Sequence, residues 1–101
     1  HKLARIWVIV ADQKIAKIFK KSGHSLKLIA EIKPEKPKPH GYKPHLPPKY
    51  VDMEHFIDDL SLWLENSAQK NLFDRLAIIV NPHMLGAMRK KLGHHTQVRI
   101  I

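Results

Sequence analysis

Two segments of the chain are continuously apolar and rich in β-branched side chains. The first covers residues 5–11 (R-I-W-V-I-V-A), and the second covers residues 76–80 (L-A-I-I-V). Short, unbroken apolar runs are typical of strands that are buried on both faces. We therefore expect both segments to be central strands that lie side by side in one sheet.

Two further segments of the first half have the pattern of strands. Residues 14–20 follow a tight turn at Asp12–Gln13, and residues 26–32 follow a turn at Gly23. Residues 26–32 alternate apolar and polar side chains, which predicts a strand covered on one side only. The apolar positions expected to share the covered face are Leu26, Leu28, Ala30 and Ile32. Together with residues 5–11, these strands predict an antiparallel meander.

Two helices and a last strand are predicted in the second half of the chain. The first helix begins with Asp52 as its N-cap, carries apolar residues at helical spacing and ends near Lys70–Asn71. The second begins at Asn81–Pro82, where an N-cap precedes a proline, and ends with Gly93 as its C′ residue. Residues 97–101 are expected to form a strand, and we expect the chain to continue beyond it.

These elements predict an α/β fold with the order β-β-β-loop-α-β-α-β. Right-handed strand–helix–strand crossovers place the second apolar run parallel to its neighbours in the sheet. We therefore expect a mixed five-stranded sheet of ribonuclease-H-like order. A chain of 101 residues has the length of one domain, so we expect residues 1–101 to form a single unit.

The positive charge of the chain is concentrated in its first half. Eighteen Lys and Arg against nine Asp and Glu give a formal net charge of +9. Residues 1–50 hold twelve basic and three acidic side chains, whereas residues 51–101 hold six of each. Such an asymmetry indicates an anionic partner such as RNA, DNA or a lipid surface. The alternative is a solvated surface that keeps a small protein soluble.

The segment 33–51 is rich in proline and lysine and contains six of the seven prolines. Because proline lacks a backbone donor and restricts its predecessor, we expect a loop with neither helix nor strand. We predict an extended basic arm whose lysines contact phosphates while a tyrosine stacks on bases; the alternative is a disordered linker. The residues predicted to bind nucleic acid in this arm are Lys33, Lys36, Lys38, Lys43, Lys49 and Tyr42.

A second basic cluster consists of Arg89, Lys90 and Lys91 at the end of the second predicted helix. One interpretation is that these side chains extend the nucleic-acid-binding surface. The other, which explains them fully, is that they compensate the negative C-terminal end of the helix.

Asp12 and Asn81 follow the two apolar runs, at the strand ends where ligand sites of parallel sheets gather. A nuclease of the ribonuclease H type needs several carboxylates there to hold two magnesium ions, and only Asp12 is an obvious candidate. We therefore interpret both residues as turn or cap residues. The sequence also lacks cysteine, a glycine-rich phosphate loop and any metal-ligand spacing among its eight histidines. We expect no catalytic residue, no metal and no cofactor.

The motifs in the two halves of the chain resemble those of bacterial host attachment proteins. The W-V-I-V-A-D run of residues 7–12 precedes a second strand and Gly23, as in the opening of that family. In the second half, F-D-R-L at residues 73–76 and L-G-A-M-R at residues 85–89 follow the family pattern. The family is in turn similar to the middle domain of archaeal and eukaryotic peptide release factors, whose fold is ribonuclease-H-like. This resemblance implies a connection with RNA or the ribosome.

Our prediction is a non-enzymatic module that binds RNA or associates with the ribosome. The Gly-Gly-Gln tripeptide that release factors use for peptidyl-tRNA hydrolysis is absent from the sequence. A protein-interaction role in attachment to host cells is the alternative, followed by a degenerate release-factor-like hydrolase. The longest apolar run is far too short to cross a bilayer and no signal peptide opens the chain, so we expect a cytoplasmic protein.

Overall fold

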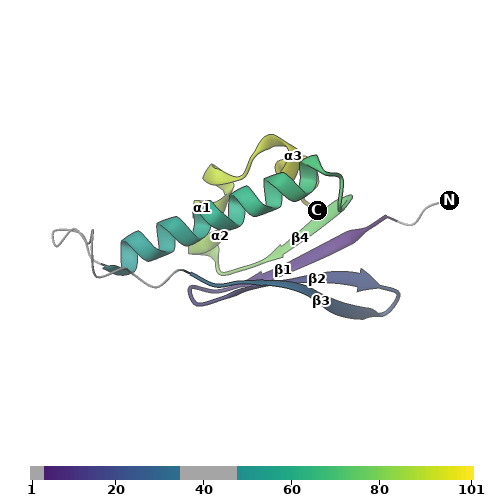
Figure 1. Ribbon diagram of the computed structural model, residues 1–101, viewed down its shortest axis with the longest axis horizontal. Helices are drawn as coiled ribbons and strands as arrows, with labels where there is room; N and C mark the ends of the chain where they lie inside the picture. Colours follow the sequence, from purple (N-terminus) through teal and green to yellow (C-terminus); the bar gives the residue numbers. More distant parts are fainter. Residues whose placement is uncertain (1–3, 35–47) are drawn as a thin grey trace.

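One β-sheet carries all the helices on a single face in the computed structural model, which describes residues 4–34 and 48–101 (Figure 1). The sheet has four strands in the order β3-β2-β1-β4. Their bounds are Ile6–Ala11 for β1, Ala16–Ser22 for β2, Ser25–Ile32 for β3 and Arg75–Ile79 for β4. The helices are α1 (Pro48–Gln69), α2 (Pro82–Lys91) and α3 (His94–Gln97). The predicted α/β class with a mixed sheet is confirmed.

The two apolar runs lie side by side, as predicted. β1 pairs in parallel with β4 and antiparallel with β2, and β2 pairs antiparallel with β3. β4, however, lies at the end of the strand order, and its last residue, Ile79, is 58% exposed. The prediction that both runs are buried on two faces is therefore wrong for β4, and it also fails for β1, because Val10 is 40% exposed on the face without helices.

The predicted fifth strand at residues 97–101 is wrong. The helix α3 extends to Gln97, and Ile100 forms only an isolated parallel bridge with Leu76. The backbone of Leu76 still holds the end of the chain, because its N–H donates to Arg99 and its carbonyl accepts from Ile101. A long-range contact of α1 with His95 and Thr96 stabilises this helical turn, which ends at the first residue of the predicted strand.

The helix α1 begins at Pro48 rather than at Asp52. Its first residues therefore belong to the segment 33–51, for which we predicted neither helix nor strand. Proline is tolerated in the first turn of a helix, since the N–H that it lacks would have no partner there. The rest of that segment, residues 35–47, lies outside the described residues.

The faces of β3 differ from the prediction because the strand contains a register shift. Ile18 pairs with Ala30, but the next residue of β2, Phe19, pairs with Leu28, so Ile29 is an additional residue in β3. One extra residue reverses the alternation of side chains beyond it. Ala30 and Ile32 accordingly pack against the core, whereas Leu28 is 44% exposed on the opposite face, which it shares with Leu26.

The core lies between the sheet and the helices. Trp7 of β1 stacks on Phe73, with ring centroids 4.8 Å apart, and on Trp63 of α1 at 5.6 Å. The other large, fully buried side chains come from both layers: Ile9, Ile18, Phe56, Leu60, Leu64, Leu76, Met84 and Met88. Among the described residues, none of the helices combines the length and hydrophobicity that a membrane span requires.

The C-terminus of α1 is closed by a Schellman motif. The Leu72 N–H donates to the Ser67 carbonyl at 3.1 Å, and the Asn71 N–H donates to the Ala68 carbonyl at 2.9 Å. Asn71 has a φ of 58°, in the left-handed region that this motif requires. The motif turns the chain from α1 towards β4.

We expect Asn71→Gly to leave the free energy of unfolding unchanged or slightly higher, because glycine adopts positive φ without steric cost. Asn71→Ala should lower it by about 1 kcal/mol, since the Cβ of alanine clashes in this conformation and the amide is lost. Urea denaturation of both variants measures the difference. Equal stability of the two variants would show that the left-handed turn is not what ends the helix.

Candidate nucleic-acid interface

The structure describes few of the side chains that we predicted to form a basic arm. Lys33 follows β3 and is exposed. Lys49 lies in α1, but its side chain is not among those described. The remaining predicted residues, Lys36, Lys38, Tyr42 and Lys43, lie outside the described residues. The role of the arm in binding therefore stays a prediction.

The basic cluster at the end of α2 is partly engaged in packing. The Lys91 Nζ lies 3.0 Å from Asp58 Oδ1 and 3.8 Å from Glu54 Oε1, both on α1. The hydrogen bond to Asp58 raises the pKa of Lys91. Arg89 and Lys90 are exposed in the last turn of α2, close to its terminal carbonyls. Lys91 thus connects α2 to α1, and a role of Arg89 and Lys90 in binding nucleic acid stays a prediction.

The strand-end residues Asp12 and Asn81 lie at the same end of the sheet, because β1 and β4 are parallel. The Asp12 carboxylate accepts the backbone N–H groups of Lys14 at 2.7 Å and Ile15 at 3.0 Å, which lower its pKa. The Asn81 side chain accepts the Met84 N–H at 2.8 Å as the N-cap of α2. Both side chains are therefore engaged in hydrogen bonds with backbone N–H groups. In the part of the chain that the structure describes, no three His, Asp or Glu side chains cluster to hold a metal ion.

The strongest concentration of described positive charge lies on the β2–β3 hairpin, and our sequence analysis did not single it out. We define the basic ribbon as residues 14–33, which contain one acidic residue, Glu31. Its six lysines, all exposed, are Lys14, Lys17, Lys20, Lys21, Lys27 and Lys33. The density of lysines was visible in the sequence. Their arrangement in space depends on the pairing of β2 with β3, in which the Gly23–His24 turn sets Lys20 opposite Lys27.

Lys20 and Lys27 are direct partners across the ribbon. Both lie on the helix-bearing face, because Lys20 pairs with the buried Trp7, yet both are exposed. Like charges that face each other across two strands are destabilising. Within the described residues, neither ammonium group forms an ion pair. The pair is therefore an uncompensated positive site that a bound anion would stabilise.

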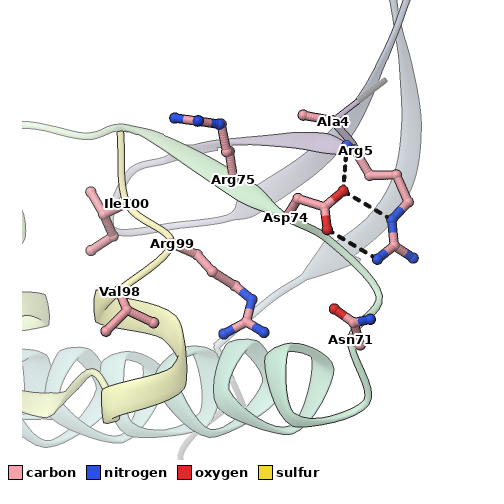
Figure 2. A pocket seen from close by; sticks show the side chains of 8 residues that line it. All are labelled: Ala4, Arg5, Asn71, Asp74, Arg75, Val98, Arg99 and Ile100. Atoms are coloured by element: carbon pink, nitrogen blue, oxygen red, sulfur yellow. Dashed lines mark hydrogen bonds and ion pairs between the residues drawn. The ribbon is translucent and has the colours of Figure 1, made fainter. Parts of the chain in front are cut away.

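A second positive region lines an open cleft of about 1030 Å³ beside the start of β1 (Figure 2). It is lined by Ala4, Arg5, Asn71, Asp74, Arg75, Val98, Arg99 and Ile100. Arg5 holds Asp74 through Nε and Nη2, each at 3.2 Å, and its backbone N–H adds a third bond at 2.7 Å. These bonds lower the pKa of Asp74 to about 2.

The other arginines of the cleft have different surroundings. Arg99 donates from Nε to the Phe73 carbonyl at 3.2 Å and from Nη1 to the His95 carbonyl at 2.6 Å. Figure 2 shows Arg75 pointing away from Asp74 and Arg99. Arg5 and Arg99 therefore join the start of β1, the turn before β4 and the C-terminal segment. We interpret the cleft as a structural junction with surplus positive charge.

Glu65 of α1 is the long-range contact that stabilises α3. Its Oε1 accepts the Thr96 N–H at 2.9 Å and the Thr96 hydroxyl at 3.0 Å, and its Oε2 lies 2.8 Å from His95 Nδ1. Burial raises the pKa of Glu65, but these hydrogen bonds, together with one from Gln69, lower it to about 2.

Gly93 is at the predicted C′ position, directly after the C-cap Leu92, but it serves the contact with Glu65 rather than a left-handed turn. Its φ of −76° is not left-handed, and a Cβ there would collide with the Glu65 carboxyl group. The glycine therefore makes room for the carboxylate that caps α3.

The comparisons with known proteins confirm the resemblance to the host attachment family and the likeness of its fold to a release factor. A family model described as "Protein required for attachment to host cells" matches residues 31–101, more than half of the chain. Among solved structures, the crystal structure of the archaeal translation termination factor aRF1 matches with a TM-score of 0.67 and 13% sequence identity. The match covers 95% of this chain but only 28% of the aRF1 chain, and at this identity it establishes the fold alone. A search of curated proteins found no match.

The carboxylate of Glu65 makes stability depend on pH. Because its pKa falls from 4.5 to about 2 in the folded state, its contribution is complete above pH 4.5 and is lost as the pH falls towards 2. We expect Glu65→Gln to lower the free energy of unfolding at pH 7 by roughly 2 kcal/mol. It should also flatten the loss of stability on acidification, although Asp74 retains part of that dependence.

Thermal unfolding between pH 2 and 7 measures both effects of Glu65→Gln. Glu54→Gln is the matched control, since the Glu54 side chain is 68% exposed and its ion pair with Lys91 is long. If the stability of both variants depends on pH in the same way, Glu65 is not the source of the pH dependence.

Proposed function

The chain belongs to the family of proteins required for attachment to host cells, and from this premise we propose that it is a non-enzymatic module that binds RNA. The observation that carries the proposal is the Lys20–Lys27 pair on the basic ribbon, whose repulsion an RNA phosphate relieves. Four further lysines of the ribbon provide an attractive field along a polynucleotide backbone. No base-specific contact is required for binding of this kind.

The fold supports a partner in the translation machinery. A protein of the same fold over 95% of this chain is a translation termination factor. The sequence lacks the Gly-Gly-Gln tripeptide that the release-factor resemblance associates with hydrolysis. The strand-end residues Asp12 and Asn81 are occupied by backbone hydrogen bonds. These observations favour binding without turnover, with RNA of the ribosome as the natural candidate.

A protein-interaction role in attachment is the second candidate. The observation that favours it is an exposed apolar sheet face, on which Val10, Leu28 and Ile79 are between 40% and 58% exposed. Binding of a protein through such a face weakens less with salt than binding through several lysines to phosphates. Salt dependence therefore separates the two candidates.

The double variant Lys20→Gln/Lys27→Gln should weaken binding to a fluorescein-labelled single-stranded RNA by about tenfold at 0.1 M salt. Each lysine lost from a phosphate contact lowers the slope of log K against log salt by about 0.7. The same variant should unfold at a slightly higher temperature, because the repulsion between the two lysines is removed. Weaker binding by a more stable protein cannot be attributed to unfolding.

The matched control is Lys70→Gln/Arg75→Gln, which removes the same charge at two exposed basic residues outside the ribbon and outside the basic cluster of α2. Its affinity for the RNA should remain close to that of the wild type. An equal loss of RNA affinity in both double variants would show that binding depends on net charge rather than on the ribbon. Salt-independent binding, or none, would exclude the proposed function.

A further inference from the structure

The face of the sheet opposite the helices is not covered by any described element (Figure 1). We call it the open face. Its side chains alternate along each strand with those that point into the core. Its apolar members are Ile6, Val8 and Val10 of β1, Phe19 of β2, Leu26 and Leu28 of β3, and Ala77 and Ile79 of β4. Several are substantially exposed, Val10 at 40% and Leu26 at 53% among them.

The registers place these side chains in rows across the sheet. The central row is Ala77, Val8, Phe19 and Leu28, which is apolar from one edge to the other. The row on one side consists of Ile79, Val10, Lys17 and Glu31. On the other side Arg75 pairs with Ile6, and Lys21 pairs with Leu26. The open face is thus an apolar strip with three cations and one carboxylate along its rims.

A face of this composition indicates a protein partner. Sheets that contain parallel pairs are usually covered on both faces, and contiguous exposed apolar residues mark interaction sites. Two copies of this chain are poorly suited to cover each other. Stacking two open faces would oppose six cations with only two carboxylates, in a chain of net charge +9.

The covered face of the same sheet shows what kind of element fits. There α1 lays an apolar stripe that includes Phe56 and Leu60 on the strands, while carboxylates such as Asp58 and Asp59 remain exposed beside it. A strand added at either edge of the sheet would leave the open face uncovered. A helix that packs across the strands would cover the open face.

We propose that the open face binds an amphipathic helix of a partner protein, with an apolar stripe flanked by aspartate or glutamate. The stripe packs on the central row at Phe19 and Leu28, and on the neighbouring Val10. The flanking carboxylates meet Lys17 on one rim and Lys21 and Arg75 on the other. This site is separate from the Lys20–Lys27 pair, which points to the opposite face of the sheet.

The test uses a synthetic helical peptide of about five turns, with leucines at i, i+3, i+4 and i+7 spacing and glutamates on both flanks. A control peptide keeps the leucines and replaces every glutamate by lysine. Titrated into isotope-labelled protein, the glutamate peptide should shift amide resonances around Val10, Phe19 and Leu28. The lysine peptide should leave them unchanged at the same concentration.

Two matched substitutions locate the site. Leu28→Gln should weaken binding of the glutamate peptide by about tenfold, because it places an amide in the apolar strip. Leu62→Gln is the control, since Leu62 is 61% exposed on α1 in the helix layer. Lys21→Gln should weaken binding several-fold and reduce its dependence on salt.

The proposal is overturned if neither peptide binds, if both bind equally, or if the shifts fall on the helix layer. It is also overturned if Leu28→Gln and Leu62→Gln behave alike. A dimer in sedimentation that Leu28→Gln dissociates would assign the face to a second copy. Shifts of open-face resonances by single-stranded RNA, with no effect of either peptide, would assign it to nucleic acid.

Discussion

The rest of the structure depends on how β1 is buried. Its apolar side chains point to both faces, and only one face is covered by helices. On the covered side, Trp7 stacks between Trp63 and Phe73, which fixes α1 and the turn before β4 over the same strand. The parallel pairing with β4 and the antiparallel pairing with β2 then follow from this central position. On the other side, Val10 is left 40% exposed. The packing that stabilises the fold thus also creates the open face.

The charges of the protein are separated in the same way as its layers. Acidic side chains gather on α1, where Glu54 and Asp58 hold Lys91 and Glu65 caps α3. The lysines of the described residues gather on the β2–β3 hairpin, which has few carboxylates to pair with. An acidic helix is therefore used for internal contacts, whereas the basic ribbon is directed to solvent. This asymmetry explains why we assign anion binding to the hairpin rather than to the helix layer.

The sequence predicted the class of the fold and most of its elements, but it placed the candidate interface too narrowly. The prolines and lysines of the segment 33–51 led to the prediction of a basic arm. Residues 35–47 of this segment lie outside those that the structure describes. The lysines of the hairpin were plain in the sequence, but the sequence analysis did not use the register that places Lys20 opposite Lys27. The two-residue turn at Gly23–His24 sets this pairing, and the face on which the pair lies depends on the register between β2 and β1.

The sequence by itself determined the two apolar runs, the amphipathic helices and the uneven distribution of charge, because each depends on residues close together in the chain. Only the tertiary structure decided three features that rest on contacts between distant residues. Glu65 caps α3, just before the predicted last strand, since its carboxylate satisfies the N–H groups of His95 and Thr96, which lie 30 and 31 positions further along. The bulge moved Leu26 and Leu28 to the uncovered face of the sheet. The described helices all lie on one face, which leaves β1, a strand apolar on both sides, with a second face that no described element covers.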